Sequence, residues 1–236
     1  MIAIGGLVSF TTIDYPGKLA AVLFLQGCPL RCPYCHNPML QTTEREGAVS
    51  WEEAFGHLQK RKGLLDGVVF SGGEPLLQTH LKKAMEEVKA LGYEIALHTS
   101  GVFPERLKDV LPLVSWVGLD IKAPREKYVT ASGTTEAFQM GKRAFEALDL
   151  VLAQGVSFEV RTTTDPRVVT KADILKLAYF LKAKGVRSYA IQEYRPAQNG
   201  LPEPTQAEIM SFYTDSDFLK ELRGIFPDLI IRRANG

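Results

Sequence analysis

The sequence has 236 residues, enough for one large domain or two small ones. Hydrophobic residues make up 45% and charged residues 23%, which is ordinary globular usage and argues against disorder or a coiled coil. The 28 Lys and Arg residues nearly balance the 27 Asp and Glu residues, so the net charge of +1 predicts no binding to nucleic acid or to an anionic membrane. Without a bilayer-spanning apolar run or a secretory signal pattern, we expect a cytoplasmic protein.

Short apolar segments alternate with longer amphipathic stretches along the chain, which predicts strands alternating with helices. The strands are expected at residues 21–26, 67–71, 94–99, 116–122, 157–163 and 188–193. Several are almost continuously apolar, as in parallel strands covered on both faces. The pattern is typical of a parallel α/β architecture, and periodicity alone leaves open whether the sheet is open or curls toward a barrel.

Local signals mark the ends of several helices. Capping-box patterns begin at Ser50, Thr170 and Thr205, and helix-ending glycines are expected at 92, 155 and 185. Residues 2–12 predict an additional strand or hairpin, and residues 229–232 a final strand. We therefore expect one domain over 1–236, with a strand or hairpin at 1–15, a core at 20–195, and a C-terminal helix and strand at 205–233.

The unusual polar and glycine-rich motifs all follow expected strands. In chain order they are the cysteine loop at 28–35, Gly72-Gly73-Glu74-Pro75, the residues 98–101, Asp120 with Lys122, Arg161, and the residues 192–195. Chemistry in parallel α/β folds gathers at the carboxyl ends of the strands. The sequence therefore predicts a single site to which all these motifs contribute.

Cys28, Cys32 and Cys35 are the three cysteines of the sequence. An odd number in one short loop is a poor disulfide framework and indicates metal binding or redox chemistry. Thiolates favour zinc, copper(I) or an iron–sulfur cluster. A 4Fe–4S cluster usually takes four cysteines, so three would leave one iron open to an outside ligand. The alternatives are zinc completed by His36, a thiol-redox loop, or no metal.

The spacing Cys-x3-Cys-x2-Cys resembles the signature of the radical S-adenosylmethionine (SAM) superfamily. The runs SFTTIDYPGKLAAVLF at 9–24 and FLQGCPLRCPYCHNP at 24–38 resemble the activases of glycyl-radical enzymes. They are most similar to those of anaerobic ribonucleoside-triphosphate reductase and pyruvate formate-lyase. The resemblance extends from about residue 8 to residue 193. It implies a partial (β/α)6 TIM-like barrel that holds a 4Fe–4S cluster and SAM.

The resemblance also implies roles for single residues. Cys28, Cys32 and Cys35 would hold three irons, with SAM on the fourth. Tyr34 matches an aromatic residue beside the adenine, and its alternative is a partly exposed loop aromatic. The motif at Gly72, Gly73 and Glu74 matches one that contacts the SAM amino group, and its alternative is a turn.

A second group of residues would bind the polar ends of SAM. Alternation along the fourth strand places Asp120 and Lys122 on one face, where a paired acid and cation could bind SAM. The resemblance places them in the SAM or partner-glycine region, and the alternative is a surface ion pair. Arg161 matches an arginine directed at the SAM carboxylate.

The sequence departs from the pyruvate formate-lyase type at two places. His98-Thr99-Ser100-Gly101 stands where that type has Asp-Thr-Asn-Gly, whose Asp helps to bind a monovalent cation. A neutral imidazole is not a hard oxygen ligand, so a cation here would depend on oxygens such as those of Thr99 and Asp120. A ribose-contacting histidine is also missing, and Tyr194 or Arg195 could replace it.

The resemblance implies an activity and its partners. One electron from flavodoxin or ferredoxin would reduce the cluster, SAM would be cleaved to a 5′-deoxyadenosyl radical, and that radical would take a hydrogen from a glycine of a glycyl-radical enzyme. Anaerobic ribonucleotide reductase is the expected partner. The alternative enzyme acts on a small molecule such as a deazaguanine precursor, and the non-enzyme alternative is a zinc-stabilised binding module.

Overall fold

The structure, a computed structural model, describes residues 2–44, 47–134, 137–196 and 201–234. Its centre is one eight-stranded sheet whose strands pair in chain order. The first strand is antiparallel to the second, and the later pairs are parallel. The strands are β1 (Ile4–Thr11), β2 (Ala20–Leu25), β3 (Gly67–Gly72), β4 (Glu94–Thr99), β5 (Trp116–Asp120), β6 (Ser157–Thr164), β7 (Tyr189–Glu193) and β8 (Ile230–Arg232).

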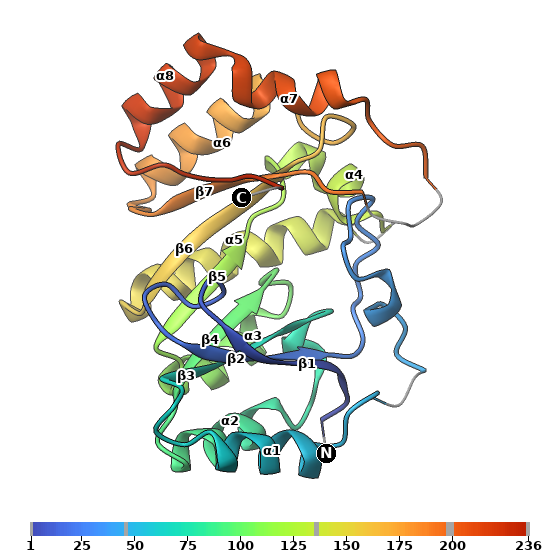
Figure 1. Cartoon of the computed structure of the whole chain (residues 1–236). Helices are drawn as coiled ribbons and strands as arrows, with labels where there is room; N and C mark the ends of the chain where they lie inside the picture. Colours follow the sequence, from blue (N-terminus) through green and yellow to red (C-terminus); the bar gives the residue numbers. More distant parts are fainter. Residues whose placement is uncertain (1, 45–46, 135–136, 197–200, 235–236) are drawn as a thin grey trace.

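Helices connect the parallel strands and cover the outer side of the curved sheet (Figure 1). They are α1 (Trp51–Lys60), α2 (Leu81–Ala90), α3 (Pro104–Val110), α4 (Tyr128–Ser132), α5 (Ala137–Gln154), α6 (Lys171–Ala183), α7 (Gln206–Thr214) and α8 (Ser216–Ile225). In the part of the chain that the structure describes, β1 does not pair with β8, so the curved sheet stays open between these two edges. This confirms the expected partial barrel of six β/α units. The strands β2 to β7 are the first elements of these six units.

The two faces of the sheet are filled differently. Outward-facing residues such as Leu23, Phe70 and Leu97 join the main hydrophobic core under the helices. Inside the barrel, a smaller apolar cluster closes the end where the parallel strands begin. It consists of Tyr15, Ala20, Val22, Val69, Ala96 and Trp116. The inner face becomes polar beyond this cluster, where the parallel register aligns Asp120 with Arg161. The polar interior is therefore confined to the carboxyl half of the barrel.

The local signals at the helix ends are confirmed. Ser50, Thr170 and Thr205 each form a complete capping box, at the start of α1, α6 and α7. The glycines at 92, 155 and 185 have φ values of 96°, 69° and 92°. This left-handed conformation ends a helix, and glycine adopts it without the steric strain that a Cβ would cause.

The fourth expected strand is shorter than predicted. β5 ends at Asp120, two residues before the expected end at Lys122. The Lys122 N–H donates to the Tyr128 hydroxyl at 3.2 Å, so the chain bonds to the following connection here and leaves the sheet.

The C-terminal stretch at 205–233 contains two helices and a strand, where one helix and a strand were expected. Asp215 separates the helices because its backbone is extended and its side chain accepts from the Phe218 N–H, which caps α8. An aspartate that caps a new helix also ends the preceding one. As to membranes, the described helices include none that is long and apolar enough to cross a bilayer.

The buried ion pair of Glu159 and Arg232 predicts that loss of either partner alone lowers the free energy of unfolding. Glu159 is 2% exposed, and its two oxygens accept from the Arg232 guanidinium at 2.6 and 3.1 Å. Replacing Arg232→Met leaves a buried carboxylate without its partner, so urea unfolding should show a loss of about 3 kcal/mol in the free energy of unfolding. The double variant Glu159→Leu/Arg232→Met is the control and should recover most of this loss. Equal losses in both variants would contradict the pairing argument.

Candidate active site

A cavity of about 380 Å³ occupies the carboxyl half of the barrel, a size that suits a small-molecule ligand. The cysteine loop and β3 to β8 all contribute to its wall. The predicted site residues that line it are Cys28, Cys32, Tyr34, Cys35, Gly72, Gly73, Thr99, Asp120, Lys122 and Arg161. Glu74 is not among the lining residues. The motifs that follow the strands thus converge in one place.

Main-chain contacts hold the cysteine loop at its start and at its middle. The Gly27 N–H donates to the Leu40 carbonyl, and the Arg31 N–H donates to the Ser132 carbonyl, each at 2.7 Å. Gly133, which ends α4, has a φ of 65°, and a Cβ there would lie 1.9 Å from the Arg31 carbonyl oxygen. Only glycine fits this approach, so the loop is seated against the end of α4.

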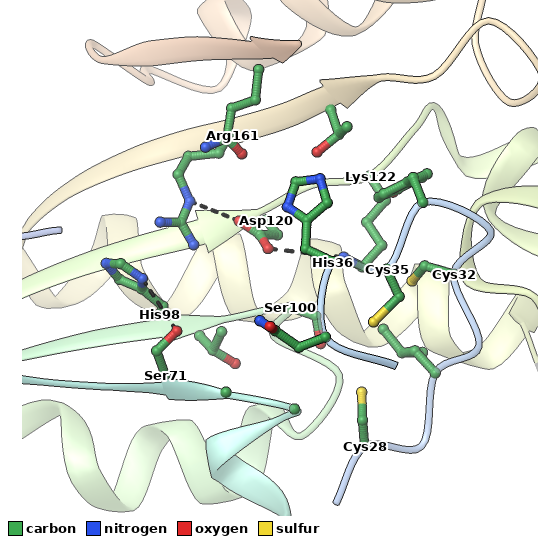
Figure 2. A pocket seen from close by; sticks show the side chains of 18 of the residues that line it. Cys28, Cys32, Cys35, His36, Ser71, His98, Ser100, Asp120, Lys122 and Arg161 are labelled. Atoms are coloured by element: carbon green, nitrogen blue, oxygen red, sulfur yellow. Dashed lines mark hydrogen bonds and ion pairs between the residues drawn. The ribbon is translucent and has the colours of Figure 1, made fainter. Parts of the chain in front are cut away.

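The three thiols face the same part of the cavity, opposite Asp120 and Arg161 (Figure 2). None forms a disulfide, and burial raises the pKa of Cys28 to about 12 and also raises that of Cys32. The described side chains contain no group of three His, Cys, Asp or Glu residues arranged to hold a metal ion, which a closed zinc site with His36 would require.

Gly72 and Gly73 are required by the backbone packing around the cysteine loop. Gly72 has a φ of 120°, and a Cβ there would lie 2.1 Å from the Leu25 nitrogen. A Cβ on Gly73 would lie 2.2 Å from the Gly27 carbonyl oxygen. The turn after β3 therefore packs directly against the start of the cysteine loop, and its backbone remains at the cavity wall.

The Glu74 side chain is buried, and its carboxylate is occupied by contacts within the protein. One carboxylate oxygen accepts from the Leu76 N–H at 3.1 Å and from the Thr99 hydroxyl at 2.6 Å. The other accepts from the N–H of Ser100 at 2.8 Å and from its hydroxyl. Burial raises the pKa of Glu74, and these hydrogen bonds oppose that shift. The carboxylate joins the loop after β3 to the end of β4.

Asp120 lies between two cations in the cavity. The Arg161 Nε donates to one of its oxygens at 2.7 Å, and the Lys122 Nζ lies 3.9 Å from the other. Burial alone would raise the pKa of Asp120, but the charges of Arg161 and Lys122 bring it below its usual range. Arg161 is in the middle of β6, not at its end as expected, and contacts Asp120, its register partner on the neighbouring strand β5. The three residues form one charged group with an excess positive charge.

Gly118 makes this arrangement possible, and the sequence analysis missed it. A Cβ at Gly118 would lie 2.8 Å from the Arg161 guanidinium carbon, so any larger residue would displace the guanidinium. Glycine inside an otherwise apolar strand is a recognised signal for close approach of another group. That signal could have identified the position.

His98 has a structural setting that excludes a charged role. Its Nε2–H donates to the Asp14 carbonyl at 2.8 Å, and its Nδ1 lies 3.4 Å from the Ser71 hydroxyl. Burial and the nearby Arg161 lower the pKa of His98 to about 3, so the imidazole is neutral. The neighbouring Thr99 hydroxyl donates to Glu74 and accepts from the Gly101 N–H, and is thus already used within the protein.

Tyr34 and the residues after β7 complete the cavity wall. Tyr34 is 5% exposed, and its hydroxyl has no hydrogen-bond partner among the described residues. Its ring lies 5.7 Å from the Lys122 Nζ. Tyr194 is not among the residues that line the cavity, and the Arg167 guanidinium lies 5.0 Å from the centroid of its ring, whereas Arg195 does line the cavity. Of the two residues expected near the ribose, only Arg195 is therefore among those that line the cavity.

The burial of Glu74 predicts that charge and acceptor count matter at this position. In Glu74→Gln the amide NH2 group would face donors, so urea unfolding should show a loss of about 2 kcal/mol in the free energy of unfolding. Glu86→Gln, on the exposed face of α2, is the matched control and should change stability by less than about 0.5 kcal/mol. Equal stability of the two variants would refute the role assigned to Glu74.

Comparison with known proteins identifies the family to which this chain is related. The radical SAM superfamily matches residues 22–178. A protein of Methanocaldococcus jannaschii, provisionally named a glycyl-radical enzyme activating enzyme, is 31% identical over 94% of this chain and 98% of its own. The pyruvate formate-lyase-activating enzyme of Clostridium pasteurianum is 34% identical over 76% of each chain.

A solved structure supports the fold. A radical SAM methyltransferase from Sphaerobacter thermophilus is 17% identical and matches with a TM-score of 0.70 over 96% of this chain and 69% of its own. The comparison shows that the partial barrel is the radical SAM fold. With three thiols at the expected spacing in its cavity and sequence similarity over nearly its whole length, the chain belongs to the radical SAM superfamily and, within it, to the glycyl-radical enzyme activating enzymes.

Proposed function

We propose that this enzyme activates anaerobic ribonucleotide reductase by removing a hydrogen atom from a main-chain glycine of that partner. The observation that carries the proposal is the single cavity shared by three thiols and by the charged group of Asp120, Lys122 and Arg161. The near full-length relationship to an activating enzyme supports a glycyl-radical enzyme as the protein substrate. The runs at 9–24 and 24–38 support the reductase as that substrate.

The cofactors of the superfamily are a 4Fe–4S cluster and SAM, and the cavity fits both. We propose Cys28, Cys32 and Cys35 as the iron ligands, since they are free thiols on one side of the cavity. When bound, the cluster and SAM supply a 5′-deoxyadenosyl radical by one-electron cleavage of SAM. The remaining task of the protein is to orient SAM and to exclude competing reactions.

The charged group is suited to the amino-acid end of SAM. Arg161 uses its Nε for Asp120, which leaves further guanidinium N–H groups for a carboxylate. Lys122 adds a second cation at the same wall, and Asp120 fixes the orientation of both. For the SAM ammonium, we propose main-chain acceptors at Gly72 and Gly73 in place of the Glu74 carboxylate, which is already occupied.

The other end of SAM needs a flat apolar contact and a polar one. Tyr34 offers a buried ring together with a hydroxyl that lacks a partner among the described residues, and we propose it for the adenine. Thr99 also lines the cavity. Its hydroxyl already donates to Glu74, so we propose that Thr99 contacts SAM through its other atoms.

A small electron-transfer protein, flavodoxin or ferredoxin, is proposed as the source of the electron. Cys28 and Cys35 are partly exposed, whereas Cys32 is buried. The same loop presents exposed residues, among them Arg31 and His36, at the protein surface. A donor that docks on this loop would therefore come close to the thiols without entering the cavity.

SAM cleavage by the anaerobically reconstituted enzyme tests the chemistry. Under dithionite, wild type should form 5′-deoxyadenosine, measured by chromatography, and Cys32→Ala should form none because a cluster ligand is missing. Met39→Ala, an exposed residue near the loop, is the control and should keep wild-type turnover. If wild type formed no product and its reduced EPR signal did not change with SAM, the chemistry would be wrong. A colourless protein with stoichiometric zinc would then favour the binding module.

Purified anaerobic ribonucleotide reductase tests the partner in the same assay. The expected result is a glycyl-radical EPR signal on the reductase that requires both SAM and this enzyme. SAM cleavage without that signal would exclude the reductase while leaving the cofactor chemistry intact. A product formed from a deazaguanine precursor would instead favour the small-molecule alternative.

Arg161→Gln should weaken SAM binding without loss of iron. Removal of a charge-assisted hydrogen bond predicts a roughly tenfold higher Kd for SAM, measured by equilibrium dialysis. Iron and sulfide content should stay at the wild-type level, since Arg161 is not a thiol ligand. Arg143→Gln, exposed on α5, is the matched control and should bind SAM like wild type. Unchanged affinity in Arg161→Gln would remove this residue from the SAM site.

A further inference from the structure

Exposed apolar side chains gather on β1 and the loop that follows it. Val8 is 41%, Phe10 51% and Ile13 79% exposed, and Leu19 at the start of β2 is 40% exposed. Val8 pairs with Val22, a residue of the inner apolar cluster, so Val8 faces the concave side of the open sheet. Exposed apolar residues grouped in this way on a protein surface indicate an interaction site.

β1 is also an unprotected sheet edge. Proteins usually guard such edges with charged residues, proline or a covering segment. The sequence of β1, IGGLVSFT, contains neither a charged residue nor proline. Among the described residues, only Ile4 at one end of this edge is paired, with Val49. Along the rest of this edge, the described residues provide β1 with no further pairing partner, and the edge lies beside the opening between β1 and β8 (Figure 1).

This edge is continuous with the cavity. β1 ends at Thr11, and the next residues, Ile13 and Asp14, line the cavity. On the other side of the opening, Arg232 of β8 also lines the cavity. A segment laid along β1 would therefore run beside the cavity, between the two free edges of the partial barrel.

We propose that β1 is the docking edge for the protein substrate, and that an extended segment next to the target glycine pairs with it as an added strand. This inference rests on the proposed function, because that function requires a chain of the partner to enter the cavity. The target hydrogen is on a main-chain carbon. Main-chain pairing positions such an atom independently of its missing side chain, while Val8 and Phe10 contact the alternate side chains of the segment.

A second copy of this chain is the competing occupant of β1. Edge-to-edge pairing of two β1 strands would also cover the apolar residues. The continuity of β1 with the cavity through Ile13 favours the protein substrate, since only an occupant that must reach the cavity gains from it. Sedimentation velocity separates the two, because self-association would occur without any partner.

Hydrogen–deuterium exchange of wild type with and without anaerobic ribonucleotide reductase tests the pairing directly. Strand addition predicts slower exchange, by roughly tenfold or more, of those amides at residues 5–11 that point away from β2 when the reductase is bound. Contact through side chains alone would leave those amides unchanged and would overturn the proposal. This exchange measurement uses the wild-type protein, so it does not depend on whether a variant folds.

The double variant Val8→Lys/Phe10→Lys tests the functional consequence. Edge lysines should raise the KM for the reductase by roughly tenfold, with SAM cleavage in the absence of reductase kept at the wild-type rate. Leu64→Lys and Tyr179→Lys, at sites 63% and 55% exposed elsewhere, are the matched controls and should activate the reductase normally.

The outcomes of these experiments distinguish a failure of the β1 docking edge from a failure of the proposed activation of the reductase. Normal activation by Val8→Lys/Phe10→Lys would overturn the docking edge alone. A wild-type dimer that the same variant converts to monomer would assign β1 to a second copy. If wild type cleaves SAM but leaves the reductase without a radical, the proposed partner falls, and the occupant proposed for β1 falls with it.

Discussion

The site depends above all on the way the buried Glu74 is held. Its main-chain N–H donates to the Gly27 carbonyl at 2.9 Å, while its carboxylate accepts four donors from its own turn and from the end of β4. One residue thus fixes three segments relative to each other: the start of the cysteine loop, the glycine turn and the loop after β4. A buried carboxylate is tolerated only when its hydrogen bonds are complete, so these segments are locked together or the fold loses stability.

The interior of the barrel shows how charge is kept in a confined space. Asp120 and Arg161 form one pair, and Glu159 and Arg232 form another. Near them His98 is held neutral by burial and by Arg161. Because Asp120 and Glu159 are each paired with an arginine, Lys122 adds a further positive charge, and its ammonium lies on the side of the thiols, near the Tyr34 ring. Lys122 would therefore attract an anionic group of a ligand bound on that side of the cavity.

Much of this arrangement could be predicted from the sequence, because parallel strands bring every β–α loop to one end. The predicted strand ends lie within two residues of the observed ends. The convergence of the motifs follows from the topology alone. The fate of Glu74 could not be predicted, because a motif does not say whether its carboxylate points to a ligand or to the next loop. Nor could the break at Asp215, since a capping aspartate and a surface aspartate within a helix look alike in sequence. Gly118 was overlooked because its role depends on Arg161, forty-three residues later.

The seating of the cysteine loop has a consequence for how the enzyme matures. The contacts that shape it join main-chain atoms of Gly27 and Arg31 to Leu40 and Ser132, and none of them involves a sulfur atom. In small zinc domains, by contrast, the ligand bonds themselves drive folding. Here main-chain hydrogen bonds seat the loop, so we expect the metal-free protein to keep this loop shape and to accept iron and sulfide into it.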